Sequence, residues 1–265
     1  MKINKVDNMW KYVIYAYLLF WVMVLGLGGL ASLVFHVSPY VMRWVTVLCS
    51  WSPTIVLWLM MRQLMPNTTI KAFYKKVFKE KIKFSIILVG TAAVVGIFLA
   101  AVFILAVVEQ TEMTAQLHFV PAALGSNILF TALQGPSGEE SGWRGYLRQE
   151  MESRYGFLKG SIILGLVWAF WHMPLWFVAS EFSGGQLIIY IASVVVVLTA
   201  FTLIISVCMK KCNNLFLAFW MHFCFNFALS FLIGDVYFFA IFASLYVAAA
   251  VGFTAIYLKQ IKVRE

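Results

Sequence analysis

The chain has 265 residues, of which 63% are hydrophobic and only 12% are charged. A soluble domain usually carries about 25% charged residues, so this composition excludes an ordinary soluble protein. The net charge of +9 does not indicate a nucleic-acid partner, because the basic residues lie between apolar stretches and not on one soluble face. We therefore expect an integral membrane protein that binds no nucleic acid.

The apolar stretches predict the architecture. A helix needs about 20 apolar residues to span a bilayer, and no linker rich in Pro, Gly, Ser or charge separates the stretches that approach this length. We predict an all-α, polytopic membrane helical bundle of about eight transmembrane helices, forming a single integral domain over residues 1–265. The eight stretches are 12–35, 44–61, 84–108, 119–134, 160–180, 186–208, 214–234 and 236–258.

A basic segment, NTTIKAFYKKVFKEKIK, separates the second and third stretches. Its apolar residues recur at helical spacing between lysines, which predicts an amphipathic helix lying in the membrane interface. The apolar positions are Ile70, Phe73, Tyr74, Val77, Phe78 and Ile82, and the lysines are Lys71, Lys75, Lys76, Lys79, Lys81 and Lys83.

The distribution of Lys and Arg predicts the orientation, because basic loops stay in the cytoplasm. With the N-terminus inside, only Arg43 falls in an external connection. We therefore expect both termini to be cytoplasmic. The basic residues placed inside are Lys2, Lys5, Lys11, those of the Arg62–Lys83 loop, those of the Arg144–Lys159 connection, Lys210, Lys211, Lys259, Lys262 and Arg264.

Ionisable residues at membrane depth are costly, so each is a candidate functional residue. The first cluster is Glu139-Glu140-Ser141-Gly142-Trp143-Arg144, which follows a break at Gly135 and Pro136. On a helix, Glu140 and Arg144 lie one turn apart and can form an ion pair. Glu139 then has no such counter-ion, which suits a general base that takes a proton from water. The alternative is a charged juxtamembrane helix whose glutamates only balance its arginines.

The second cluster, Trp168-Ala169-Phe170-Trp171-His172-Met173-Pro174, lies deep in the fifth apolar stretch. Pro174 removes a backbone hydrogen bond and can kink the helix beside His172. A single histidine on an apolar helix is more often a packing residue, and the tryptophans could equally form an aromatic belt.

The third cluster, His222-Phe223-Cys224-Phe225-Asn226, lies in the seventh stretch. The four-residue spacing places His222 and Asn226 on one helix face, which we expect to point into the bundle. Asn226 could instead only bond a neighbouring helix.

Together the three clusters supply the groups needed to hydrolyse a peptide bond. Glu139 would activate water, an imidazole would orient it, and His/Asn donors would stabilise the oxyanion. A second interpretation is a catalytic zinc site, in which Glu139, His172 and His222 would be the ligands. The HExxH pattern of helical zinc peptidases is absent, and the residues alone leave both a divalent zinc ion and a metal-free site open.

The three clusters also resemble the EExxxR, FxxxH and HxxxN/D motifs of the CAAX protease and bacteriocin-processing family of intramembrane peptidases. The resemblance covers roughly residues 120–235, with Trp168 in place of the usual phenylalanine. It implies a polar catalytic cavity in this core and catalytic roles for Glu139, Glu140, Arg144, His172, His222 and Asn226. It also implies a location in a bacterial plasma membrane.

The expected function is that of an intramembrane endopeptidase that cuts a hydrophobic, membrane-bound or prenylated-type peptide. Its partners would be the lipid bilayer and a hydrophobic peptide or membrane-protein substrate. The alternative is a non-catalytic membrane protein, such as an immunity factor or an accessory or scaffold for a sensor or transporter.

Overall fold

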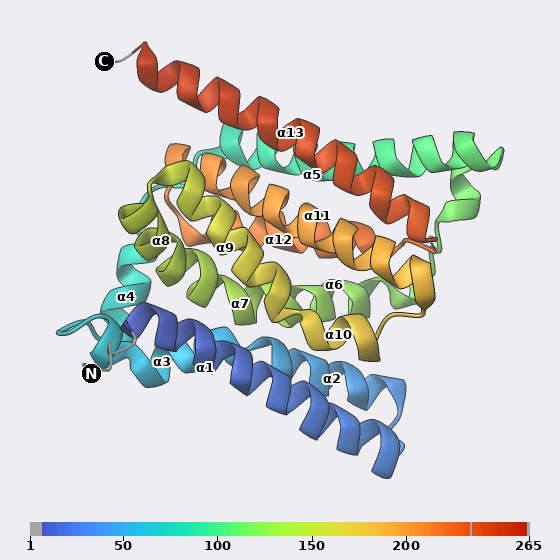
Figure 1. Cartoon of the computed structure of the whole chain (residues 1–265), viewed down its shortest axis with the longest axis horizontal. Helices are drawn as coiled ribbons and strands as arrows, with labels where there is room; N and C mark the ends of the chain where they lie inside the picture. Colours follow the sequence, from blue (N-terminus) through green and yellow to red (C-terminus); the bar gives the residue numbers. More distant parts are fainter. Residues whose placement is uncertain (1–6, 234, 264–265) are drawn as a thin grey trace.

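The computed structural model describes residues 7–233 and 235–263, and every regular element in this part of the chain is a helix. The helices lie roughly alongside one another and form a bundle (Figure 1). An isolated bridge between Leu117 and Leu232 is the strand-like pairing found outside the helices. The prediction of an all-α bundle is confirmed.

Five helical stretches are long and apolar enough to cross a membrane: Asn8–Val34, Pro39–Leu64, Phe84–Glu109, Gly184–Lys211 and Val236–Lys262. The first is α1 (Asn8–Val22) and its π-helical continuation, and the second joins α2 (Pro39–Ser50) to α3 (Ser52–Leu64). The other three are α5, α11 and α13, with the bounds just given.

The remaining three predicted stretches contain shorter helices. They are α6 (Leu124–Ala132), α9 (Phe157–Trp171) followed by α10 (Met173–Val178), and α12 (Leu215–Leu229). Each of the eight predicted stretches therefore contains a helix, but three are too short or too interrupted to be recognised as spans by length. The site residues lie on these interrupted helices and on the segment that follows α6.

Close packing around α11 forms the centre of the bundle. A Cβ atom added to Gly165 of α9 would lie 2.6 Å from the Thr199 Cα of α11, so glycine is needed for the two backbones to approach. On its other side, the Phe201 ring stacks on Phe225 of α12 at 4.7 Å between centroids, and Tyr246 of α13 packs edge-on against both rings. These contacts fix the helices of the second and third motifs relative to each other.

The predicted cytoplasmic segments lie at the same end of the bundle. The start of α1, α4 (Ile70–Val77), α8 (Arg148–Tyr155) and the end of α13 lie at the left in Figure 1. An ion pair between Asp7 and Arg154, 2.8 Å long, joins the first and third of these. The side of the membrane that this end faces remains a prediction, and Lys2, Lys5 and Arg264 lie outside the described residues.

The amphipathic helix is shorter than the sequence predicted. α4 ends at Val77, and the chain from Phe78 to Lys83 is not helical, so Ile82 does not share its face. Phe73 and Val77 are buried, whereas Ile70 is exposed. The helix ends early because residues 78–81 bond instead to the connection between α11 and α12.

Candidate active site

The first motif lies on a helix that is interrupted inside the bundle. Gln134 (φ −85°, ψ 122°) and Gly135 (φ 85°, ψ −89°) leave the helical conformation, and the chain turns helical again in α7 (Gly138–Glu140). A Cβ atom on Gly135 would lie 2.9 Å from Asn226 Nδ2 and 3.1 Å from His222 Nε2. Both the positive φ and this close approach require glycine, which places the break directly against the third motif.

The segment after the break enters the protein interior. A Cβ atom on Gly138 would lie 2.7 Å from the Ser50 carbonyl oxygen at the end of α2. Glu139, Glu140 and the whole π-helical turn Ser141–Leu147 are buried. Such π-helical turns are frequently found at functional sites, and here the turn carries Arg144.

The Glu140 carboxylate is enclosed by cationic and imidazole partners. Its Oε1 accepts hydrogen bonds from Arg144 at 3.0 Å and from His222 Nδ1 at 2.7 Å. Arg144 also donates to Thr202 Oγ1 at 2.9 Å, and its guanidinium lies 4.0 Å from the centre of the Trp168 ring. The predicted pair between Glu140 and Arg144 is confirmed. Because the charged groups are buried, these contacts hold α7, α9, α11 and α12 together.

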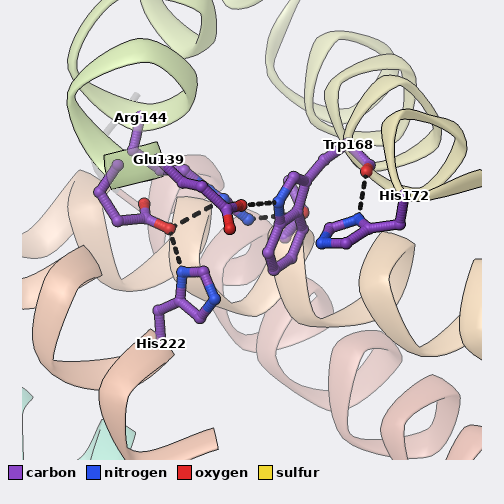
Figure 2. Close-up of polar contacts among 7 residues, drawn as sticks. Glu139, Arg144, Trp168, His172 and His222 are labelled. Carbon is purple, nitrogen blue, oxygen red and sulfur yellow. Dashed lines mark hydrogen bonds and ion pairs between the residues drawn. The ribbon is translucent and has the colours of Figure 1, made fainter. Parts of the chain in front are cut away.

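Glu139 has a different partner. Its Oε2 accepts a hydrogen bond of 2.6 Å from the indole N–H of Trp168, and of the two glutamates Arg144 bonds to Glu140 and not to Glu139 (Figure 2). The prediction that Glu139 lacks the arginine counter-ion is therefore confirmed. A phenylalanine at position 168 could not donate this bond.

The second motif lies where two helices meet. α9 ends at Trp171, and α10 begins at Met173 with Pro174 in its first turn, so His172 occupies the junction. Its Nδ1 lies 2.8 Å from the Trp168 carbonyl oxygen, and since a carbonyl only accepts, this nitrogen carries the hydrogen. The lone pair of the neutral ring is then on Nε2, which is free to bind water.

A cavity of about 960 Å³ brings the motifs together. Glu139, His172, His222 and Asn226 all line it, together with Trp168, whose ring centre is 5.7 Å from that of His172 and 5.1 Å from that of His222. Glu140 and Arg144 do not line the cavity and lie behind it. The six predicted residues thus form one site with two parts, a cavity wall and a buried support.

Glu139, His172 and His222, the predicted ligands, are not arranged so that they could hold a metal ion together. Across residues 7–233 and 235–263, the structure contains no group of three His, Cys, Asp or Glu side chains that could hold a metal ion. Glu139 bonds to Trp168, and His222 directs Nδ1 to Glu140. We therefore derive no chemical step through a metal.

Two contributors to the site were missed by the sequence analysis. Trp168 was expected to supply only an aromatic ring in place of phenylalanine. The substitution itself, which adds an N–H donor, is the feature of the sequence that could have predicted the bond to Glu139. Thr202, buried in the apolar helix α11, was not considered at all; a hydroxyl in such a helix is a weak signal, because it usually bonds to its own backbone.

The fold and this geometry define the class: a polytopic helical membrane protein with a buried carboxylate and two histidines at one internal cavity. Residues 121–228, which include all six site residues, match the model of the family described as type II CAAX prenyl endopeptidase Rce1-like. CAAX prenyl protease 2 of Methanococcus maripaludis is 28% identical over 192 residues, which cover 66% of this chain and 67% of that protein. The segment 121–228 is therefore similar to an Rce1-like domain, and the resemblance inferred from the three motifs is confirmed.

Proposed function

We propose that this chain is an intramembrane endopeptidase of the CAAX type, in which Glu139 activates the water that cleaves the peptide bond. The observation that carries the proposal is the placement of Glu139. Its carboxylate is held by the Trp168 N–H at a cavity that also contains His172, His222 and Asn226. The Rce1-like domain and the prenyl protease name of the relative support the same activity.

The first chemical step is attack by water. One oxygen of Glu139 is occupied by Trp168, and the other accepts a proton from a water molecule in the cavity. His172 Nε2 accepts the second hydrogen of that water and orients it. The water oxygen then forms a bond to the carbonyl carbon of the substrate, and the carbonyl oxygen takes the negative charge.

The third motif stabilises that charge. The Asn226 amide N–H group donates to the oxyanion from the cavity wall, and His222 Nε2 donates when the ring carries both protons, with Nδ1 on Glu140. When the C–N bond breaks, Glu139 returns its proton to the leaving nitrogen. The carboxylic acid that forms gives its hydroxyl proton to the amine, so the products are a carboxylate and an ammonium group, and the glutamate is regenerated.

Glu140 and Arg144 act indirectly in this scheme. They fix the ring orientation of His222, in the way that a carboxylate partner orients a catalytic histidine. We therefore assign them positioning roles, while Glu139, His172, His222 and Asn226 contact the reacting groups.

The cavity walls favour an apolar substrate. Apart from the site, the lining is mainly aliphatic and aromatic, with Phe20, Leu175, Trp176 and Phe239 among the contributors. Glu139 and Arg43 are the charged residues that line it within the described part of the chain. We propose a hydrophobic, membrane-bound or prenylated peptide as substrate.

The test compares cleavage of a farnesylated CAAX peptide by the purified wild type and by Glu139→Gln. Loss of the general base is expected to lower kcat by about 100- to 10,000-fold. Glu152→Gln is the matched control, because Glu152 pairs with Arg148 and Lys210 outside the cavity. Undiminished cleavage by a folded Glu139→Gln variant would contradict the assignment.

A further inference from the structure

A second surface of interest lies at the end of the bundle where α4 is located. Within the basic segment, residues 70–83 expose six lysines and, between them, large apolar side chains. Ile70, Phe78 and Ile82 are 42 to 47% exposed, and Phe84, which follows directly, is 69% exposed. The exposed lysines are Lys71, Lys75, Lys76, Lys79, Lys81 and Lys83.

This mixture of charge and apolar surface fits a lipid partner. The segment leads directly into α5, whose 26 residues from Phe84 form one of the long apolar helices, so it lies at the level of the headgroups. Clusters of four to eight basic residues beside a membrane span attract anionic lipids. The exposed aromatic and aliphatic side chains would be buried among the acyl chains, as in interfacial helices, whereas a merely solvated basic face would leave them in water.

The basic segment also contacts the first motif. The Tyr74 hydroxyl lies 3.0 Å from Ser141 Oγ and accepts a hydrogen bond of 3.2 Å from the Trp58 indole N–H. A Cβ atom on Gly145 would lie 2.9 Å from Phe73 Cζ, so α4 packs directly against the π-helical turn. Ser141 and Gly145 each follow directly after a member of the Glu140–Arg144 pair.

A second set of contacts joins the segment to the start of α12, the helix that carries the third motif. The Glu80 carboxylate accepts a hydrogen bond of 2.8 Å from the Asn213 backbone N–H, and the Asn214 side chain donates to the Glu80 carbonyl oxygen at 2.6 Å. The Asn213 N–H and the Lys83 ammonium hold the pKa of Glu80 below its usual value, so this contact persists at neutral pH. Asn214 also caps α12, the helix of His222 and Asn226.

We propose that the basic segment binds anionic phospholipid headgroups of the cytoplasmic leaflet, and that this binding activates the protease by holding α4 against the π-helical turn and α12. The effect on catalysis rests on the proposed function, whereas the binding itself does not. Through its contacts with the π-helical turn and with the start of α12, the basic segment can affect the positions of Glu140 and His222 without a ligand in the cavity.

The experiment places the full-length protein in nanodiscs of phosphatidylcholine alone or mixed with phosphatidylglycerol. Hydrogen exchange of the α4 amides reports binding, and cleavage of a farnesylated CAAX peptide reports activity. Phosphatidylglycerol should slow exchange in α4 and raise the cleavage rate of the wild type. The double variant Lys71→Gln/Lys75→Gln should need more phosphatidylglycerol for both effects, with apparent affinity falling about fivefold per lysine removed.

Three controls keep the outcome decisive. Lys259→Gln/Lys262→Gln removes the same charge from the end of α13 and should behave as wild type. Tyr74→Phe keeps the lysines but loses the bond to Ser141, so it should retain slow exchange and lose most of the activation. Inorganic phosphate and a soluble polyglutamate, added to neutral nanodiscs, should reproduce neither effect.

The possible results separate the two proposals. Equal losses in the two lysine pairs, an α4 that exchanges equally fast in both lipids, or full activation by phosphate or polyglutamate would overturn the lipid site. Full activation of Tyr74→Phe would overturn the route through Ser141. Lipid-dependent exchange without cleavage in any sample would leave the lipid site standing and contradict the proposed peptidase.

Discussion

Two carboxylates adjacent in sequence occupy opposite sides of the site. Glu139 faces the cavity and is held by one indole N–H, whereas Glu140 faces away from it and is held by Arg144 and His222. Consecutive residues on a helix point in different directions, so one short segment supplies both a reactive group and a structural one. A charge buried in a membrane bundle can therefore be neutralised by a neighbour or left available at a cavity.

The largest effect, on the free energy of unfolding, is expected when the buried Glu140–Arg144 pair loses one of its two members. Arg144→Ala would leave the Glu140 carboxylate buried with only His222 as a partner, which costs about 3–5 kcal/mol in such pairs. The free energy of unfolding in detergent, measured by thermal or chemical denaturation, checks this. The double variant Glu140→Gln/Arg144→Met should recover most of the loss, since it leaves neither charge unpaired. A double variant as unstable as the single would mean that packing and not charge dominates here.

The next largest effect is expected at Gly135, where the interrupted helix approaches the third motif. Gly135→Ala places a methyl group against Asn226 and His222 at a positive φ, and displacement of such groups by about 1 Å can lower activity roughly 100-fold. The measurement is kcat for peptide cleavage beside the thermal unfolding midpoint. Gly125→Ala on α6 is the control, because nothing lies near its added methyl. Similar kcat values for the two variants would contradict the close contact.

A smaller effect isolates the bond that orients Glu139. Trp168→Phe keeps an aromatic ring but removes a hydrogen bond to a charged group, worth about 1.5–3 kcal/mol, so cleavage should fall about tenfold or more. Trp143→Phe is the matched control. That side chain is equally buried, and its indole N–H has no partner among the described residues, so its loss should leave cleavage unchanged. Equal activity in both variants would remove Trp168 from the account.

The smallest effect concerns the second partner of Arg144. Thr202→Val keeps the side-chain shape but removes the hydroxyl that accepts from the guanidinium at 2.9 Å. The free energy of unfolding should fall by about 1.5 kcal/mol, the lower end of the range for a hydrogen bond to a charged group, and kcat should change little. Ser206→Ala, one helical turn away, is the control because its buried hydroxyl has no partner in the part of the chain that the structure describes. A large loss of kcat in Thr202→Val would place Thr202 closer to the chemistry than proposed.

Much of the fold could be predicted because hydrophobicity and helix formation are coupled in membranes, where backbone groups must bond internally. The long helices α5, α11 and α13 followed directly from their apolar lengths. The sequence could not show that the basic segment stops being helical at Val77. That end depends on hydrogen bonds from Asn214 to carbonyl groups more than 130 residues away.

The site was only partly predictable for the same reason. The Glu140–Arg144 pair is local, since a four-residue spacing is enough to predict it. The bond from Trp168 to Glu139 and the bond from Thr202 to Arg144 join separate helices, so they depend on packing that no local pattern encodes. The depth of Glu139 depends on the break at Gln134 and Gly135, where the sequence shows a glycine and a proline but not the direction of the turn.

The division between the two glutamates is tested most directly by comparing Glu139→Gln with Glu140→Gln in one preparation, with cleavage and unfolding measured on each. The account predicts that Glu139→Gln loses cleavage and keeps nearly the stability of the wild type. Glu140→Gln should instead lose stability, because it leaves Arg144 as an unpaired buried charge. A Glu139→Gln variant that still cleaves, or one that is as destabilised as Glu140→Gln, would contradict the division of the site into a reactive wall and a buried support.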